Sequence, residues 1–178
     1  TTGWTQLPAN RIDLGGEIEE PLSLQWGGDF SELQAALLKQ GWQVAVAFDL
    51  QSVGGYLRST TTPLALPVLP SLQDGRPPAL TLVKELSLFE RSILHIWPTP
   101  FVLESPGRNP ILIGSIVREK IYHPVGLITF YSRMRGLPID TIDVVRGLPN
   151  ATVVTRTTAP AVSEDAPTRQ QRVVLAAP

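Results

Sequence analysis

The sequence predicts an α+β domain, a mainly antiparallel β-sheet with two or three helices packed on it. Two observations carry this prediction. Three runs rich in Leu, Ile and Val, bounded by Pro or Gly, have the length of strands and follow one another as a meander; they are 77–84, 91–97 and 110–117. One segment, 29–40, carries helix signals at both ends. We expect about five to seven strands.

The first predicted strand is 21–26. Leu22, Leu24 and Trp26 alternate there with Ser23 and Gln25. A period of two is typical of a strand with one buried face.

The helix 29–40 is the most strongly indicated element. Asp29 is expected to cap it, with Glu32 three residues later, and apolar residues recur at helical spacing. Gly41 follows at the position of a C′ glycine, and Trp42 stands where the hydrophobic contact of a Schellman motif would lie.

The rest of the chain carries weaker signals. Asp49 is expected to cap a second helix that uses Leu50, Val53 and Leu57, although Gly54 and Gly55 weaken it. A Thr- and Pro-rich connection and an Asp-Gly turn lead into the meander. The remaining expectations are a loop at 118–124, strands at 126–131, 151–156 and 172–175, a short helix at 139–146, and a flexible Pro/Ala-rich loop at 159–171.

Composition limits the class of protein. The 178 residues are read as a single domain, 1–178, with a net charge of -1 that suggests no nucleic-acid partner. The chain has no cysteine, which excludes disulfides and thiolate metal sites. No apolar run reaches the length of a membrane-spanning helix. The chain begins without Met, and we expect a fragment of a longer protein.

Familiar catalytic motifs are absent from the sequence. It holds no glycine-rich dinucleotide fingerprint, Walker loop, Gly-x-Ser-x-Gly elbow or His-Glu-x-x-His pair. We expect no cofactor and no metal. A nucleophile site could combine Ser115 and His123 with Asp140 or Asp143, but Ser115 is as well explained by packing in an apolar strand.

Two groups of residues are candidates for binding. Arg91, His95 and Trp97 share one face of a predicted strand and could hold an anion or stack on a ligand; the alternative is a half-exposed cross-strand histidine beside a tryptophan. A basic patch of Arg118, Lys120 and His123 could bind anionic headgroups. Its alternative is a coding bias toward arginine.

Several segments together resemble the LssY C-terminal domain family. They are LPANRIDL (7–14), EPLSLQWG (20–27), LPVLPSLQDGRP (66–77), ALTL (79–82), ILHIW (93–97) and ILIGS (111–115). The Asp-Gly-Arg-Pro turn and the Leu-x-x-Trp strand are the most specific of these. The resemblance implies a soluble domain of a bacterial membrane-associated protein, joined to a lipid-phosphatase-like (PAP2-like) or DedA-like membrane region. The side of the membrane is open, and a periplasmic location is one of the two alternatives.

We therefore expect a non-catalytic accessory or ligand-binding module rather than an enzyme. Its expected partners are the membrane portion of the parent protein or anionic headgroups, and the oligomeric state is open. The alternative is a small hydrolase for a phosphorylated or acylated lipid-like substrate, in which two or more of Asp74, His95, Ser115 and His123 would converge. A third possibility is assembly through an exposed sheet edge.

Overall fold

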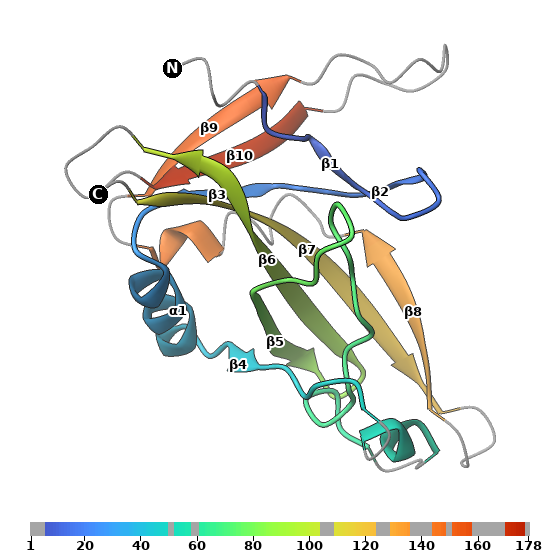
Figure 1. Ribbon diagram of the computed structural model, residues 1–178. Coiled ribbons are helices and arrows are strands. Elements are labelled where there is room, and N and C mark those ends of the chain that lie inside the picture. Colours follow the sequence, from blue (N-terminus) through green and yellow to red (C-terminus); the bar gives the residue numbers. More distant parts are fainter. Residues whose placement is uncertain are drawn as a thin grey trace.

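A mainly antiparallel β-sheet of eight strands forms the centre of the protein, in a computed structural model that describes residues 6–49, 52–57, 61–103, 109–123, 129–135, 144–148, 151–157 and 170–176. The strand order is β4-β5-β6-β7-β3-β10-β9, and β8 also pairs with β7 (Figure 1). Only the β10–β3 pair is parallel among these pairings. The strands are β3 (Leu24–Gly27), β4 (Gln43–Val44), β5 (Leu80–Ser87), β6 (Glu90–Val102), β7 (Pro110–Tyr122), β8 (Phe130–Arg135), β9 (Ala151–Thr157) and β10 (Gln170–Ala176).

The predicted antiparallel sheet is confirmed, with more strands than the expected five to seven. A separate two-stranded sheet, β1 (Asn10–Ile12) and β2 (Ile18–Pro21), lies beside it. The two or three helices are not confirmed: the described residues contain one α-helix of seven or more residues, α1 (Phe30–Lys39). A single helical turn at 144–146 and a 3-10 helix, η2 (Ser52–Leu57), complete the helical part.

Strands β6 and β7 are the longest strands of the sheet, with 13 residues each. On the side away from β6, β7 pairs with two different strands, one after the other. The first half of β7 pairs with β3, from Gly114 opposite Leu24 to Ile111 opposite Gly27. The second half pairs with β8, from Val117 to Tyr122. One long strand therefore serves two different neighbours, and Ser115 lies where the sheet divides.

The helix α1 begins and ends as the sequence predicts. The Asp29 side chain accepts hydrogen bonds from the backbone N–H groups of Ser31 and Glu32 at 2.7 and 3.1 Å. At the other end Gly41 has a φ of +88°, and the Trp42 N–H donates to the Leu37 carbonyl at 3.2 Å while Gly41 donates to Leu38. These bonds form the Schellman motif.

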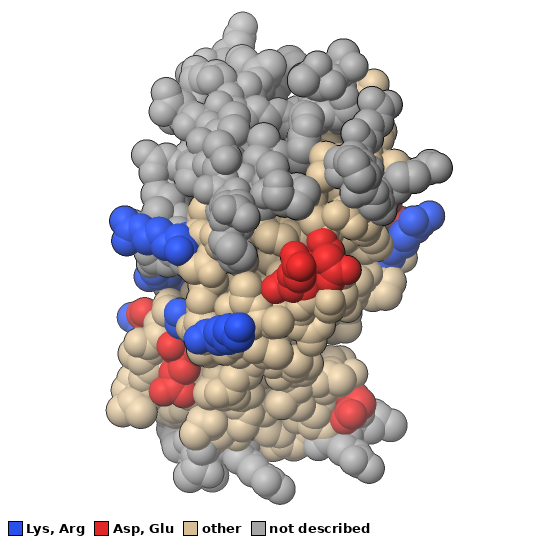
Figure 2. Space-filling view, turned by 90° about the vertical axis from the view of Figure 1, so that its left-hand side faces the viewer, with Lys and Arg blue, Asp and Glu red and all other residues tan. Residues whose placement is uncertain are grey.

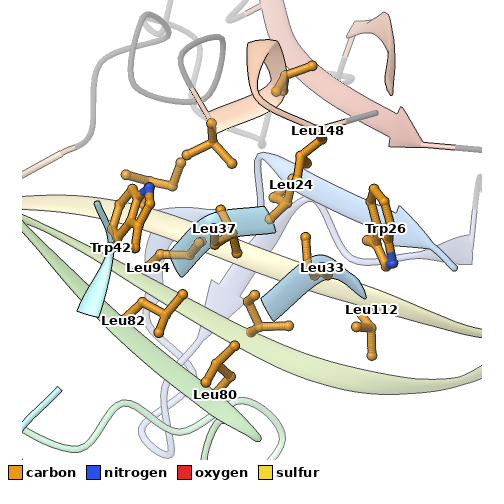
Figure 3. Close-up of a cluster of buried hydrophobic side chains, with 14 residues drawn as sticks. Leu24, Trp26, Leu33, Leu37, Trp42, Leu80, Leu82, Leu94, Leu112 and Leu148 are labelled. Atoms are coloured by element: carbon orange, nitrogen blue, oxygen red, sulfur yellow. The ribbon is translucent and has the colours of Figure 1, made fainter. Parts of the chain in front are cut away.

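One face of the sheet packs against α1 and forms the main core (Figure 3). Leu33 and Leu37 of the helix meet Leu94 and Ile96 of β6, and Trp42 closes the cluster. The other members of the cluster are Leu24, Trp26, Leu80, Leu82, Leu112, Ile116, Val144, Val145 and Leu148.

The opposite face of the sheet is also buried. The β1–β2 hairpin and the connection 61–79 lie over it (Figure 1). Gln25 in β3 is therefore buried as well as Leu24 and Trp26. The strand predicted at 21–26 is present as β3, although it begins at Leu24; the prediction of one buried face was wrong, because β3 is buried on both faces.

Other sequence predictions meet mixed outcomes. The predicted loop at 118–124 was wrong through Tyr122, because β7 continues there between β6 and β8. Asp49 does cap the following segment, since its side chain accepts from Ser52 N–H at 2.7 Å, but that segment is a 3-10 helix. The strands predicted at 151–156 and 172–175 are present. The segments 136–143 and 158–169, with most of the predicted short helix and loop, lie outside the described residues, as do 124–128.

On the face shown in Figure 2, basic and acidic side chains are interspersed and separated by uncharged residues. No described helix is both long and apolar enough to cross a membrane.

Candidate binding site

A pocket of about 470 Å³ is lined by residues of the Asp-Gly turn at 74–75 and of the second half of β6. Its walls are mostly apolar and rich in proline and aromatic residues. They are formed by Gln6, Leu7, Pro8, Gln73, Asp74, Arg76, Pro77, Ala79, Trp97, Pro98, Thr99, Pro100, Phe101 and Ile113. The size and composition are those of small-molecule sites.

The turn that forms one wall is a tight two-residue β-turn. Asp74 and Gly75 both have positive φ, at 50° and 72°, and the backbones of Gln73 and Arg76 exchange two hydrogen bonds of 3.0 Å. Asp-Gly is a preferred pair for this type I′ geometry. The backbone N–H and carbonyl of Gln73 are both used in the turn, and its side chain is buried.

Trp97 is one of the residues that line the pocket. It comes from β6, is 1% exposed, and belongs to a second core cluster with Leu7, Leu22, Ile111 and Ile113. Its indole Nε1 has no hydrogen-bond partner in the described part of the chain, and neither does the Gln73 Oε1. Both atoms belong to residues that line the pocket.

A buried ion pair holds the turn in place. Arg11 of β1 donates to both carboxylate oxygens of Glu20 in β2 at 2.8 and 3.0 Å, and to the carbonyl of Leu72 at 3.0 Å. Burial alone would raise the pKa of Glu20, but the hydrogen bonds and charge of Arg11 outweigh it and lower that pKa. The β1–β2 hairpin is thus tied to the residue before Gln73.

Arg91 holds the preceding part of the same connection. It is fully buried, and its five N–H donors are used by Glu119 in β7 and by the carbonyls of Pro63, Leu66 and Pro67. A proline-rich segment has few N–H groups with which to join a sheet, so a side chain must satisfy its carbonyls. Arg91 therefore has no donor left for a ligand.

His95 lies beside Trp97, with ring centroids 5.6 Å apart. It is 1% exposed, so the expectation of a half-exposed histidine was wrong; the β1–β2 hairpin and the 61–79 connection cover it. Burial lowers its pKa to about 4, helped by the positive charge of Arg133. Its Nδ1 is 3.2 Å from Thr81 Oγ1, and its Nε2 has no partner in the described segments.

Of the four residues proposed for a hydrolase, two come together. His95 and Ser115 are directly opposite in the β6–β7 pairing. Ser115 Oγ donates to Glu20 Oε1 at 3.3 Å. Neither His95 nor Ser115 lines the pocket. Asp74 lies on the pocket turn, and His123 follows the far end of β7.

The predicted basic patch lies away from this pocket. Arg118 and Lys120 are on β7, and His123 follows it. The Lys120 ammonium is 5.6 Å from the ring centre of Tyr122, and His123 Nδ1 is 3.1 Å from Thr129 Oγ1. The two predicted groups of binding residues are therefore separate in the structure.

Three carboxylates could meet around a cation. Asp13, Glu17 and Glu19, in and beside the β1–β2 hairpin, have oxygen atoms within 4.8 Å of one another. The turn itself explains part of this, because Asp13 accepts a hydrogen bond from the Glu17 N–H at 2.8 Å. Such groups are common on exposed turns without a metal, and the arrangement alone assigns none.

Sequence reasoning missed Gln73, Thr99 and Phe101 as lining residues, and Arg11 and Glu20 as supports. Gln73 and Arg11 lie in segments that carry the family resemblance, so that resemblance was an available signal. Nothing local indicates the contact of Arg11 with Leu72, because 61 residues separate them.

The comparison with known proteins agrees with the resemblance. Searches of curated proteins and of solved structures found no match. The family model described as LssY C-terminus matches residues 4–145, which includes every residue that lines the pocket. On this evidence, the chain belongs to the LssY C-terminus family.

Proposed function

We propose that this chain is a non-catalytic ligand-binding module whose ligand sits in the Trp97 pocket. The observation that carries the proposal is the pocket itself, whose walls are mostly apolar and whose lining residues include no histidine, serine or cysteine. The Thr99 hydroxyl, the one hydroxyl in the lining, donates to the Ile111 carbonyl at 2.8 Å. Such a site is suited to binding rather than to turnover.

The wider setting is part of the same proposal. Members of this family are expected as soluble domains of bacterial membrane-associated proteins, beside PAP2-like or DedA-like regions. In that setting the module would report or deliver a small molecule to the membrane portion of the parent protein, on its periplasmic side. The α+β class fits this role, because rigid sheet strands and a pinned connection keep the pocket preformed.

A pocket-blocking variant tests the proposal. Ala79 is an exposed lining residue, so Ala79→Phe should fill the pocket without disturbing the core; Ala35→Phe, at an exposed position of α1, is the matched control. We expect one class in a panel of headgroups, lipid analogues, glycans and divalent metals to raise the melting temperature by about 5 to 10 °C at a hundredfold excess over Kd. The rise should vanish in Ala79→Phe and persist in Ala35→Phe.

Other outcomes of that experiment point elsewhere. A rise that survives Ala79→Phe but is lost in Lys120→Ala would move the site to the patch of Arg118, Lys120 and His123, and anionic headgroups would then be the ligand. A flat response across the whole panel would contradict the ligand-binding proposal.

The alternative is a small hydrolase acting on a phosphorylated or acylated lipid-like substrate. One observation favours it: His95, which burial keeps neutral at pH 7 by lowering its pKa to about 4, lies opposite Ser115. Two observations oppose it: the Ser115 hydroxyl donates its hydrogen bond to Glu20 rather than to His95, and Ser115 and His95 are both buried. We expect no turnover of p-nitrophenyl butyrate or p-nitrophenyl phosphate above background. Turnover that disappears in Ser115→Ala would establish the hydrolase.

A further inference from the structure

The turn between β5 and β6 carries apolar side chains at its most exposed positions. Ser87 pairs with Glu90, so Leu88 and Phe89 are the two central residues of a tight turn, and they are 74% and 51% exposed. Such turns favour Gly, Asn or Asp at these positions, as in the Asp74–Gly75 turn. This turn is held through backbone groups, because the Phe89 N–H donates to Ser87 Oγ at 3.2 Å. The local fold therefore does not require a leucine and a phenylalanine here.

The end of the β7–β8 pair extends this apolar surface. Tyr122 and Phe130 are directly opposite one another there, and both side chains are exposed. Phe89 lies beside this end, because its carbonyl accepts from the Ile121 N–H at 2.7 Å. Both turns lie at the lower end of the sheet in Figure 1. Single exposed apolar residues are ordinary, whereas a group of them marks an interaction surface. This group, named the apolar tip, consists of Leu88, Phe89, Tyr122 and Phe130.

Behind the apolar tip, one face of the sheet is basic. Lys84 of β5 and Arg118 and Lys120 of β7 lie at even-numbered positions, as do the main-core residues of these strands, and therefore point to the same face. All three are partly exposed and are named the basic face. On the same part of strands β5 to β7, Glu90 is the one acidic residue, so the local charge is positive. Within the described residues neither lysine forms an ion pair.

The β1–β2 hairpin provides a comparison within the same chain. It also exposes apolar side chains, with Leu14 at 77% and Ile18 at 55%. Its charged neighbours, however, are the carboxylates of Asp13, Glu17 and Glu19, which have oxygen atoms within 4.8 Å of one another. The two ends match in apolar exposure and differ in charge. A negatively charged surface would be repelled by the hairpin and attracted by the basic face.

We propose that the apolar tip and the basic face together form a docking surface for a lipid bilayer that contains anionic headgroups. Leu88 and Phe89 enter the boundary between headgroups and acyl chains, while the lysine ammonium groups, on flexible stems, stay level with the phosphates. A bilayer fits better than an acidic protein segment, because the apolar side chains project from a turn instead of lining a groove. The surface lies at the other end of β6 from the Trp97 pocket, so this inference goes beyond the proposed function.

Flotation of the 178-residue chain with lipid vesicles tests the docking surface. The vesicles contain phosphatidylcholine alone or phosphatidylcholine with about 30% phosphatidylglycerol. We expect the chain to float with the anionic vesicles at low salt, and to bind the neutral ones about tenfold more weakly. Leu88→Ser combined with Phe89→Ser should lower binding to the anionic vesicles about tenfold or more, because it removes the side chains that enter the bilayer.

Matched variants separate the apolar contribution from the charge. Leu14→Ser combined with Ile18→Ser makes the same kind of change on the acidic hairpin and should leave flotation unchanged. Lys84→Gln combined with Lys120→Gln should lower binding to the anionic vesicles about tenfold and weaken its dependence on salt. Far-ultraviolet circular dichroism confirms that each variant is folded.

The outcomes distinguish this inference from the proposed function. Absence of flotation with anionic vesicles, equal binding to both kinds of vesicle, or an equal loss in the hairpin variant would each overturn the docking surface. Ala79→Phe, which blocks the pocket, should float like the unsubstituted chain. If it does not float, vesicle binding belongs to the pocket; the docking surface is then overturned and the ligand-binding proposal stands.

Discussion

Replacing Arg91 by Met should lower the free energy of unfolding by about 3 to 5 kcal/mol. The substitution leaves the Glu119 carboxylate buried at 1% exposure, and within the described residues its remaining ion pair is with Arg133 at 3.6 Å. It also removes the donors to the carbonyls of Pro63, Leu66 and Pro67. A loss of this size is a large part of the stability of an ordinary domain. Urea denaturation followed by tryptophan fluorescence measures it.

Two further variants show that the loss comes from the uncompensated charge. Arg91→Met combined with Glu119→Leu should recover part of the stability, because no carboxylate is then left buried. Lys84→Met, at a partly exposed position on the neighbouring strand β5, should change stability by less than about 1 kcal/mol. A cost below about 1 kcal/mol for Arg91→Met would contradict the pinning role of Arg91.

Stability should fall as the pH drops from 6.5 to about 4, by about 3 kcal/mol, because of His95. Burial, with Arg133 and Arg11 nearby, lowers the pKa of His95 from 6.5 to about 4, although Glu20 acts in the opposite direction. The unfolded chain therefore takes up a proton on this residue at a higher pH than the folded chain does. Between these pH values the unfolded state binds more protons, so the free energy of unfolding decreases as the pH falls. Below about pH 4 both states are protonated at His95 and this residue causes no further loss.

Denaturation series at fixed pH values between 7.5 and 4 measure this slope. His95→Gln should flatten it, and His123→Gln, at the other histidine of the chain, should leave it in place. Glu20 adds a separate loss below its usual pKa of 4.5, because its carboxylate is stabilised in the folded state. If the stability of the unsubstituted chain is constant between pH 7 and 4.5, His95 is not buried in the way described.

The elements that the sequence predicted well are those set by near neighbours. Helix α1 follows from Asp29 at one end and Gly41 at the other, and each acts through hydrogen bonds within five residues. The turn at Asp74–Gly75 follows from the backbone conformation that this pair favours. The strands β5 and β6 follow from short runs rich in Leu, Ile and Val that are bounded by Pro or Gly.

The misreading of β7 has a specific physical cause. After Val117 its inward positions are Glu119 and Ile121, and a glutamate at a buried position hides the alternation. Glu119 is tolerated there because Arg91, 28 residues earlier, donates to it at 2.7 and 2.9 Å. A local pattern cannot show that a charge has a partner on the neighbouring strand.

The candidate site divides in the same way. Trp97 was identified from the sequence as a binding residue, and the family resemblance marked the Asp-Gly-Arg-Pro turn. Their meeting in one pocket depends on the packing of the 61–79 connection across the sheet, which Arg11 and Arg91 fix through carbonyls of proline-rich backbone. Burial of His95 depends on the same covering layer.

The sequence alone determined the class of sheet, the capped helix and the tight turn, because these depend on the residue pattern and the hydrogen bonds of short segments. It also determined the family, through the resemblance of several such segments. The tertiary structure decided the length of β7, the burial of its second face and the pocket between Gln73 and Trp97. These depend on buried charges and carbonyls that find their partners across tens of residues, and such pairing exists only once the chain is folded.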